Sequence, residues 1–195
     1  MFAYLSGKFS FKSAAQVYVD VNGVGYEVNI TLNTYASIEQ QSEGKLFTYL
    51  QIKEDAHTLY GFAEKEEKDM FVLLISVSGV GAATARMMLS SLKPGEVAAA
   101  VASNNIRLIE SVKGIGKKTA ERLVLELKDK VGVKSDAGSQ TWDRGINSME
   151  RDAVNALFAL GIAQKQAEQS VKKILTSEPD ISKLEDLIKK ALKAI

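Results

Sequence analysis

The sequence has no cysteine and only one histidine, His57, and these two scarcities exclude several kinds of site. Without cysteine the chain has no disulfide, no thiolate metal ligand and no thiol nucleophile, which is typical of proteins in a reducing compartment. A metal site made of several histidines and a catalytic triad that needs one are also implausible. We therefore expect no metal, no cofactor and no catalytic residue.

Long hydrophobic runs are lacking as well. No apolar stretch approaches the roughly 20 residues that a membrane-spanning helix needs. The first residues do not combine a basic segment with a long apolar one, as a secretory signal would. We therefore expect a cytoplasmic protein that makes no contact with a membrane.

The chain also lacks an excess of charge of one sign, because 25 Lys and Arg stand against 24 Asp and Glu in 195 residues. Most nucleic-acid-binding domains carry a clear basic excess. The charges are, however, unevenly distributed. Residues 1–62 hold four basic and six acidic residues, residues 75–134 hold ten and five, and residues 135–195 hold nine of each. The middle of the chain is therefore where we expect an anionic ligand to bind.

Aromatic residues are concentrated at the start of the chain, where residues 1–62 hold 11 of the 14. Aromatic and β-branched residues favour strands, and Asn22-Gly23 is a tight-turn signal between two alternating segments. We predict five short strands, near residues 2–9, 17–21, 26–30, 46–53 and 57–62. A Greek-key barrel of the oligonucleotide-binding (OB) type closes five strands in this way, and an SH3-like barrel or an open sheet are alternatives.

After residue 62 the apolar spacing becomes helical. We predict helices over residues 63–77, 82–92, 96–103, 106–111 and 117–131. Glycine, serine and asparagine then predict a flexible linker over residues 132–147. Three short helices follow: the first is capped by Ser148 and ends at Gly161, the second covers residues 164–175, and the last begins at Asp180 or Ser182.

The prediction is thus a multi-domain α+β chain. It has an OB-like β-barrel (residues 1–63), an all-α domain (residues 64–131), the linker (residues 132–147) and a three-helix module (residues 148–195).

A seven-residue pattern occurs twice in the basic region, 35 residues apart. The two copies read Gly79-Val80-Gly81-Ala82-Ala83-Thr84-Ala85 and Gly114-Ile115-Gly116-Lys117-Lys118-Thr119-Ala120. Glycines allow left-handed backbone in a tight turn, and the N–H groups that begin the following helix can bind a phosphate oxygen. The repeat predicts two helix–turn–helix units that contact the DNA backbone without reading its sequence.

Other interpretations of the repeat fit less well. A Walker A loop needs glycine at the position of Ser111, and a dinucleotide-binding fingerprint needs a third glycine where Thr84 and Thr119 stand. Two purely structural helix corners are the plain alternative. The second copy is surrounded by Lys117, Lys118 and Arg122, whereas the first has Ala82 and Ala83 at the lysine positions and would bind mainly through its backbone, aided by Arg86.

The whole chain resembles the RuvA family, the Holliday junction-binding subunits of the bacterial branch-migration complex. The resemblance rests on the order and spacing of six motifs, which are Val24-Gly25-Tyr26-Glu27-Val28, Lys53-Glu54-Asp55-Ala56, Leu59-Tyr60-Gly61-Phe62, Gly79-Val80-Gly81, the stretch from Gly114 to Leu123, and Leu157-x-x-Leu160-Gly161.

The resemblance implies a homotetramer that binds a four-way DNA junction in recombination, DNA repair and the SOS response. Two helix-hairpin-helix motifs in each subunit would bind the DNA, through Gly79, Val80, Gly81, Ala82, Arg86, Gly114, Ile115, Gly116, Lys117, Lys118, Thr119 and Arg122. An acidic pin, matched by Glu54 and Asp55, would repel phosphates at the junction centre. An ordinary solvated turn is the alternative for these two residues.

The resemblance also implies that the C-terminal module, which is UBA-like, binds the RuvB ATPase motor. The matching residues are Leu157, Leu160, Gly161 and Ile162, although the family often has an aromatic residue at the last of these positions. The RuvC resolvase is a further candidate partner. The chain itself would not be an enzyme. The alternatives to this function are a DNA glycosylase or nuclease, with Asp129 as the one downstream aspartate in the helical region, and a protein-binding adaptor.

Overall fold

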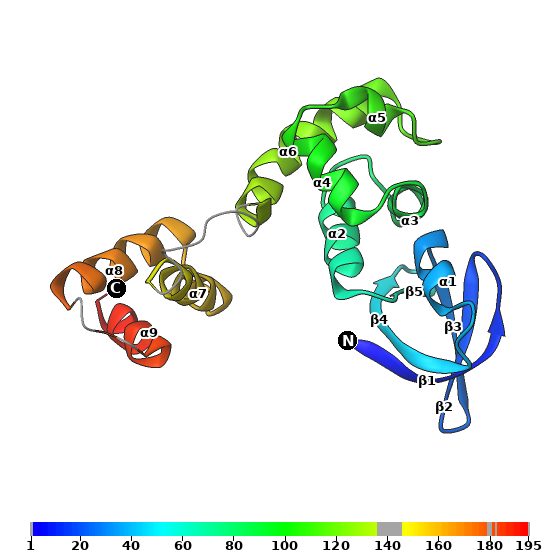
Figure 1. Cartoon of the computed structure of the whole chain (residues 1–195), viewed down its shortest axis with the longest axis horizontal. Helices are drawn as coiled ribbons and strands as arrows, with labels where there is room; N and C mark the ends of the chain where they lie inside the picture. The colour runs from blue at the N-terminus through cyan, green and yellow to red at the C-terminus, as the bar shows by residue number, and fades with distance from the viewer. Residues whose placement is uncertain (1, 136–145, 179–180, 182, 195) are drawn as a thin grey trace. The chain divides into compact units, whose positions relative to one another are not determined.

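The computed structural model describes residues 2–135, 146–178, 181 and 183–194 (Figure 1). It divides into two compact units, Met1–Ala137 and Gly138–Ile195. Each unit is described by itself below.

The first unit begins with a closed five-stranded barrel. Its strands are β1 (Tyr4–Lys12), β2 (Gln16–Val21), β3 (Val24–Ile30), β4 (Glu43–Ile52) and β5 (His57–Phe62). They follow the order β1-β2-β3-β5-β4, and β1 pairs with β4 to close the barrel. The β3–β5 pair is parallel and the other pairs are antiparallel. This is the Greek-key order of the OB type, so the predicted barrel is confirmed and an open sheet is excluded.

Local sequence explains the β2–β3 hairpin. Val17, Val19 and Val28 alternate with exposed residues and are fully buried in the barrel. Asn22 and Gly23 connect the strands with φ angles of 53° and 87°. Positive φ at both central residues is what a type I′ turn requires, and it explains why Asn-Gly is favoured there.

A short helix that the sequence analysis did not predict, α1 (Leu32–Ile38), connects β3 to β4. Thr31 caps it, because its side-chain oxygen accepts a hydrogen bond from the Thr34 N–H at 2.9 Å. Seven residues are too few for a helix to be stable alone. Its stability therefore depends on the neighbouring helical region, with which it makes the contacts described below.

The rest of this unit is helical. It consists of α2 (Lys65–Ile75), α3 (Ala82–Ser91), α4 (Pro94–Ala102), α5 (Ile106–Glu110) and α6 (Lys117–Ser135). Helix α2 packs against β4 and β5 (Figure 1). Tyr60 and Phe62 of β5 belong to the same buried cluster as Phe71 of α2 and the apolar residues of the later helices. The barrel and the helices therefore share a continuous hydrophobic core across residue 63.

Helices extend into the predicted linker from both ends. Helix α6 continues to Ser135, because a single glycine inside a helix costs only about 1 kcal/mol and strong helix formers precede it. Helix α7 (Ile146–Ala159) begins two residues before Ser148, so this serine is not its cap. The apolar spacing of Ile146, Met149 and Ala153 already has the helical period. The remaining part of the predicted linker, residues 136–145, lies outside the described residues.

The second unit consists of the three predicted helices α7, α8 (Gln164–Ser177) and α9 (Leu184–Lys193). Their apolar faces meet in one core that includes Ala153, Leu157, Val171 and Leu187. Helix α9 starts after Lys183, later than the predicted start at Asp180 or Ser182, two residues that lie outside the described part of the chain. Among the helices of the described residues, none has the length and apolar character to cross a membrane.

Candidate nucleic-acid interface

The turns between α2 and α3 and between α5 and α6 have the same backbone geometry. Gly79 has φ of 90° and Gly114 has φ of 91°, a left-handed conformation that favours glycine. One residue later in each turn, the Val80 and Ile115 N–H groups donate to the carbonyl oxygens three residues earlier, both at 3.1 Å. The sequence repeat at a spacing of 35 residues is therefore also a structural repeat.

The aliphatic residue of each turn packs inward. Val80 and Ile115 are each 5% exposed, and both belong to the core of the helical region. Ala85 and Ala120, which end the two copies of the pattern, are also fully buried. These contacts fix the angle at which the second helix of each hairpin leaves the turn.

The second glycine of each turn immediately precedes a helix. Gly81 caps α3 in an extended conformation (φ −83°, ψ 166°) and makes no side-chain cap hydrogen bond. The Ala85 N–H donates to the Gly81 oxygen and the Ala120 N–H to the Gly116 oxygen, both at 2.9 Å. The N–H groups before Ala85 and Ala120 have no earlier helical carbonyl to bind, so the start of each helix can accept an anion.

Both turns are open enough for an anion to approach. A Cβ placed on Gly79, Gly81, Gly114 or Gly116 would meet no atom within 4 Å. Small size at these positions is therefore not required by packing within the chain. It is compatible with close approach of another molecule, such as a DNA backbone, to the helix starts.

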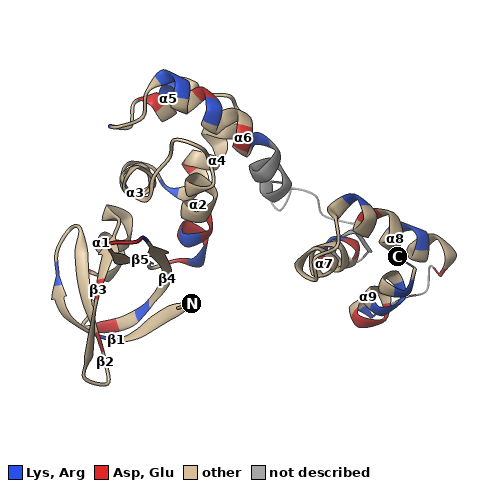
Figure 2. Ribbon diagram, turned by 180° about the vertical axis from the view of Figure 1, so that it is seen from behind, with Lys and Arg blue, Asp and Glu red and all other residues tan. Residues whose placement is uncertain are grey.

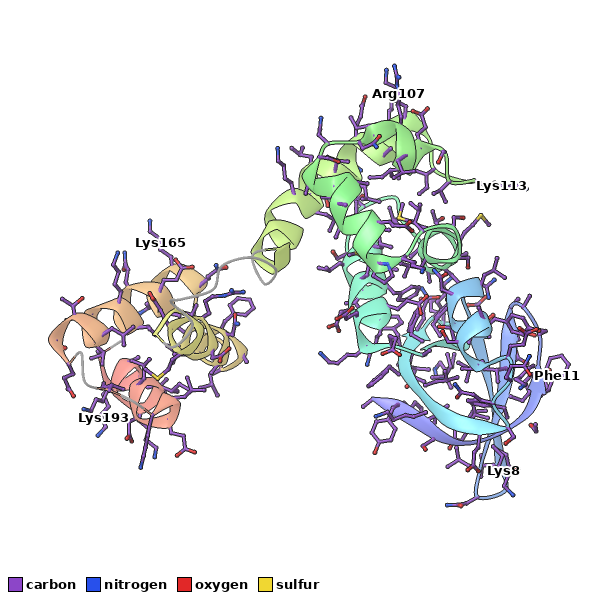
Figure 3. The ribbon with its side chains drawn as sticks, in the orientation of Figure 1. Lys8, Phe11, Arg107, Lys113, Lys165 and Lys193 are labelled. Atoms are coloured by element: carbon purple, nitrogen blue, oxygen red, sulfur yellow. The ribbon has the colours of Figure 1, made fainter. Side chains whose placement is uncertain are left out.

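Basic side chains surround the second turn. Lys117 and Lys118 are exposed on the first turn of α6, and Thr119 beside them is half-buried. Arg122 is exposed and lies 3.8 Å from the Glu126 carboxylate (Nε to Oε1). Figure 2 shows the basic residues along α5 and α6, and Figure 3 shows Arg107 and Lys113 at the end of this unit away from the barrel.

The first turn differs in its side chains. Ala82 is only 5% exposed and can offer only its backbone N–H. Arg86 is directed to the barrel, where its Nη1 donates to Asn29 Oδ1 at 2.9 Å and to the Ala15 oxygen at 3.3 Å. Its assignment to DNA stays a prediction, and the structure gives its guanidinium another role.

The two predicted pin residues lie at the tip of the β4–β5 hairpin. The Lys53 N–H donates to the Ala56 oxygen at 2.9 Å and closes the turn, and Glu54 and Asp55 are both exposed within it. His57 begins β5 opposite Ile52 and is exposed. The hairpin therefore presents two carboxylates to the solvent with no burial of their charge.

The four predicted motor-binding residues of the second unit differ in their exposure to solvent. Leu157 is fully buried and Ile162 packs against the same core, whereas Leu160 is 64% exposed. Gly161 has φ of 91° and ends the α7 segment. Leu160 is thus the accessible apolar side chain of the set.

Phe158, two residues before Leu160, is also accessible, since the residue is 62% exposed, and sequence reasoning missed it. It is the sole aromatic residue of the segment 148–195. Because cores usually take up aromatic side chains, a lone aromatic residue outside the apolar stripe of its helix was the signal that could have identified it.

Among the described residues, Glu67 and Tyr60 have pKa values that burial displaces. Burial raises the pKa of the Glu67 carboxyl, although hydrogen bonds from Thr31 and Thr34 oppose the shift. Burial also raises the pKa of Tyr60, against the opposing charge of Arg86. Both residues lie where the barrel meets the helices. Within the described residues, no group of three or more acidic or histidine side chains is arranged to hold a metal ion.

Three family models match the chain. They are the RuvA N terminal domain over residues 1–61, the SAM-like helix-hairpin-helix tandem over residues 71–129, and the RuvA C-terminal domain over residues 148–195. Together they account for most of the chain in the order in which the structural elements occur.

Curated relatives match over the whole length. A Christiangramia forsetii protein is 48% identical over 195 residues, with 100% of both chains covered. One from Flavobacterium psychrophilum is 48% identical over 193 residues, with 99% of both covered, and one from Bacteroides fragilis is 42% identical over 202 residues, with 100% of both covered. Each is described as a Holliday junction branch migration complex subunit RuvA.

Proposed function

The chain belongs to the RuvA family, and we propose on that basis that it is the junction-binding subunit of a branch-migration complex. In this function it binds four-way DNA junctions and holds them for a partner motor in recombination and repair. It is a DNA-binding, non-catalytic subunit, and the hydrolysis of ATP belongs to the partner.

The equal geometry of the two glycine turns is the observation that carries this proposal. Two turns with matching φ angles, matching inward aliphatic residues and matching helix starts support two phosphate sites of the same backbone geometry. Contacts of this kind fix the position of a protein on DNA without reading bases. A ligand defined by the paths of its backbones, such as a junction of four duplex arms, suits them.

The acidic hairpin tip supports the same function through repulsion. Glu54 and Asp55 are both exposed at this tip. Opposed to phosphates, they raise the free energy of DNA that approaches the tip closely. The arms are therefore attracted at the helix starts, while the crossover is kept open at the pin.

The assembly follows the family resemblance. We propose that the protein acts in the cytoplasm as a homotetramer, so that four copies place four pins around one crossover. The motor is the RuvB ATPase, which binds the C-terminal module at the exposed Leu160 and Phe158. The RuvC resolvase is proposed as a further partner on the same junction.

The test compares a synthetic four-way junction with a linear duplex of equal length in competition gel shifts at several salt concentrations. We expect the junction to bind much more tightly. Lys117→Glu with Lys118→Glu should abolish binding, because each change replaces a proposed phosphate contact with a carboxylate that repels the phosphate. Lys172→Glu with Lys173→Glu is the matched control, because it reverses two exposed charges on α8.

Three results would contradict the proposal. The first is equal affinity of the wild-type protein for junction and duplex. The second is unchanged binding by the Lys117 and Lys118 double variant, which would favour a protein-binding adaptor. The third is strand cleavage or base excision by the purified chain, which would favour a nuclease or glycosylase.

A further inference from the structure

A buried carboxylate joins the barrel to the first hairpin. Glu67 of α2 is 4% exposed and faces the start of α1. Its Oε1 accepts a hydrogen bond from Thr31 Oγ1 at 2.5 Å, and its Oε2 accepts one from Thr34 Oγ1 at 2.7 Å. Neither donor carries a positive charge, and neither is among the residues proposed to bind phosphate.

The directions of these hydrogen bonds are fixed by the backbone. Thr31 Oγ1 accepts the Thr34 N–H at 2.9 Å, and Thr34 Oγ1 accepts the Ala63 N–H at 3.0 Å. Each hydroxyl therefore accepts from the backbone and donates its proton to the carboxylate. Both oxygens of Glu67 serve as acceptors, so the network specifies one relative position of α1, α2 and the β5–α2 connection.

Further polar contacts join the barrel to α3. The Asn33 Nδ2 of α1 donates to the Leu89 oxygen at 2.5 Å. Arg86 donates from α3 back to Asn29 of β3 at 2.9 Å. The Leu32 N–H, at the start of α1, donates to Ser90 Oγ at 3.1 Å. The first hairpin is thus held to the barrel on both of its helices.

The same helix α2 is packed directly on the hairpin that carries the pin. The Phe71 ring contacts the rings of Tyr49 and Tyr60, with centroids 5.5 and 5.1 Å apart. Tyr49 and Tyr60 are cross-strand partners of β4 and β5. The pair nearest the hairpin tip, Ile52 and His57, is three residues further along these strands. At the usual rise of a strand this is a distance of about 10 Å.

We propose that this seam, which consists of Asn29, Thr31, Asn33, Thr34, Glu67 and Arg86, is a rigid coupling between the acidic hairpin tip and the first phosphate-binding turn. Glu67 and Arg86 are positioning residues in this arrangement. The inference rests on the proposed function, because it states how the chain selects a four-way junction over a linear duplex.

The physical reason is geometric. A linear duplex needs only the two helix starts, so its affinity does not depend on where the pin lies. A junction requires the pin at the crossover while the turns contact the arms, so an error in their relative position reduces only junction affinity. The hydrophobic effect is non-directional, whereas hydrogen bonds to both carboxylate oxygens have a restricted geometry. A seam that served only stability would not need a buried carboxylate, because apolar residues often replace such groups without loss.

The first test measures the coupling without DNA. The natural chain has no cysteine, so Ala56→Cys beside the pin and Met87→Cys on α3 take two spin labels at defined places. Labelled chains are diluted into unlabelled protein so that distances within one chain dominate the pulsed electron resonance signal. We expect a narrow distribution of distances between the two labels in the otherwise wild-type protein. We expect it to widen at least twofold when Glu67→Gln or the pair Asn29→Ala and Asn33→Ala is added.

The second test measures binding by the same seam variants without labels. We expect junction affinity to fall about tenfold, equivalent to about 1.4 kcal/mol, with duplex affinity unchanged. Glu66→Gln is the matched control, because it removes the same charge from an exposed neighbour on α2. The double asparagine variant alters only half-buried side chains, so it keeps the test valid if Glu67→Gln unfolds.

A separate pair of variants distinguishes the two roles of Arg86. Asn29→Ala removes the side-chain acceptor on the barrel, leaves the Ala15 oxygen in place and keeps the positive charge, whereas Arg86→Met removes both hydrogen bonds and the charge. If Arg86 is a positioning residue, both variants lower junction affinity and neither changes duplex affinity. If it is a phosphate ligand, only Arg86→Met weakens binding, and it weakens both substrates.

The outcomes separate the coupling from the proposed function. A distance distribution that stays narrow in the seam variants overturns the coupling, whatever the DNA results are. A wider distribution with an unchanged ratio of junction to duplex affinity overturns its role in selectivity. Equal wild-type affinity for the two substrates overturns the proposed function instead, and with it the selectivity argument.

Discussion

The two glycines of the first turn should respond to substitution in opposite ways. Gly79 has φ of 90°, so the residue is needed for its backbone conformation. Gly81 has φ of −83° and caps α3, so other residues can adopt its conformation. We predict that Gly79→Ala destabilises the fold, and that Gly81→Asp keeps the fold and destroys the phosphate site.

The magnitudes follow from the geometry. A Cβ at either position meets no atom within 4 Å, so neither change causes a clash. A left-handed conformation costs a residue with a Cβ about 1–2 kcal/mol, which for a unit of this size lowers Tm by about 2–8 °C. Aspartate is a better cap than glycine by a few tenths of a kcal/mol, and its charge at a helix start contributes about 0.3–1 kcal/mol more.

DNA binding should respond in the reverse order, because Gly81→Asp should weaken it and Gly79→Ala should not. An aspartate at Gly81 would accept the same N–H groups that the proposed phosphate uses and would repel the phosphate as well. The negative slope of log affinity against log salt should then become shallower by about 0.9 for each phosphate that is displaced. Gly79→Ala should leave this slope near the wild-type value at temperatures where the protein is folded.

Thermal unfolding by circular dichroism and junction titration at several salt concentrations measure the two effects on the same samples. Gly95→Ala is the matched control, because its Cβ also meets nothing within 4 Å and its φ is not positive; it should leave both quantities unchanged or raise Tm slightly. The reasoning is refuted if Gly81→Asp lowers Tm as much as Gly79→Ala does. It is also refuted if Gly81→Asp keeps the wild-type affinity and salt slope.

Two further predictions concern other parts of the chain. Because burial raises the pKa of Glu67 above its ordinary value of 4.5, the folded state binds this proton more tightly than the unfolded state does. Urea denaturation measures the difference between the free energies of unfolding of the wild type and Glu67→Gln. This difference should therefore favour the wild type most below about pH 4.5 and fall as the pH rises through the raised pKa. A difference that stays constant or rises with pH would contradict this sign. In the second unit, Phe158→Asp with Leu160→Asp should abolish binding to the RuvB ATPase in a pull-down with junction DNA and leave junction affinity unchanged. Leu157→Ala should instead unfold the module at a cost of about 2–5 kcal/mol, and motor binding that survives the double aspartate change would exclude this surface.

Much of the fold could be predicted because its signals are local. The alternation of Val17, Val19 and Val21 and the turn at Asn22-Gly23 specify a hairpin within a few residues of sequence. The repeated glycine pattern likewise predicts both turns, since a left-handed residue and an inward aliphatic residue need no distant partner. These elements occur in the structure with the expected geometry.

The features that could not be predicted depend on contacts between distant residues. Helix α1 is short, and the Thr31 that caps it is bonded to Glu67, 36 residues further along the chain. Arg86 directly follows the first copy of the glycine repeat in the sequence, yet its side chain is directed by Asn29, 57 residues earlier. Phe158 is a different case, because its place outside the apolar stripe of its helix is a local signal that composition alone does not reveal.

The hydrophobic core that continues from β5 into α2 has a consequence for how the chain can be divided. The family models separate residues 1–61 from residues 71–129, but Phe62 and Phe71 are packed ring against ring with centroids 4.9 Å apart. A chain ending at residue 63 would expose Tyr60 and Phe62, and an isolated helical fragment would expose Phe71. The barrel and the hairpins are thus two units of homology within one cooperative folding unit. A graft of the hairpins onto another scaffold would have to carry the β4–β5 ribbon with it.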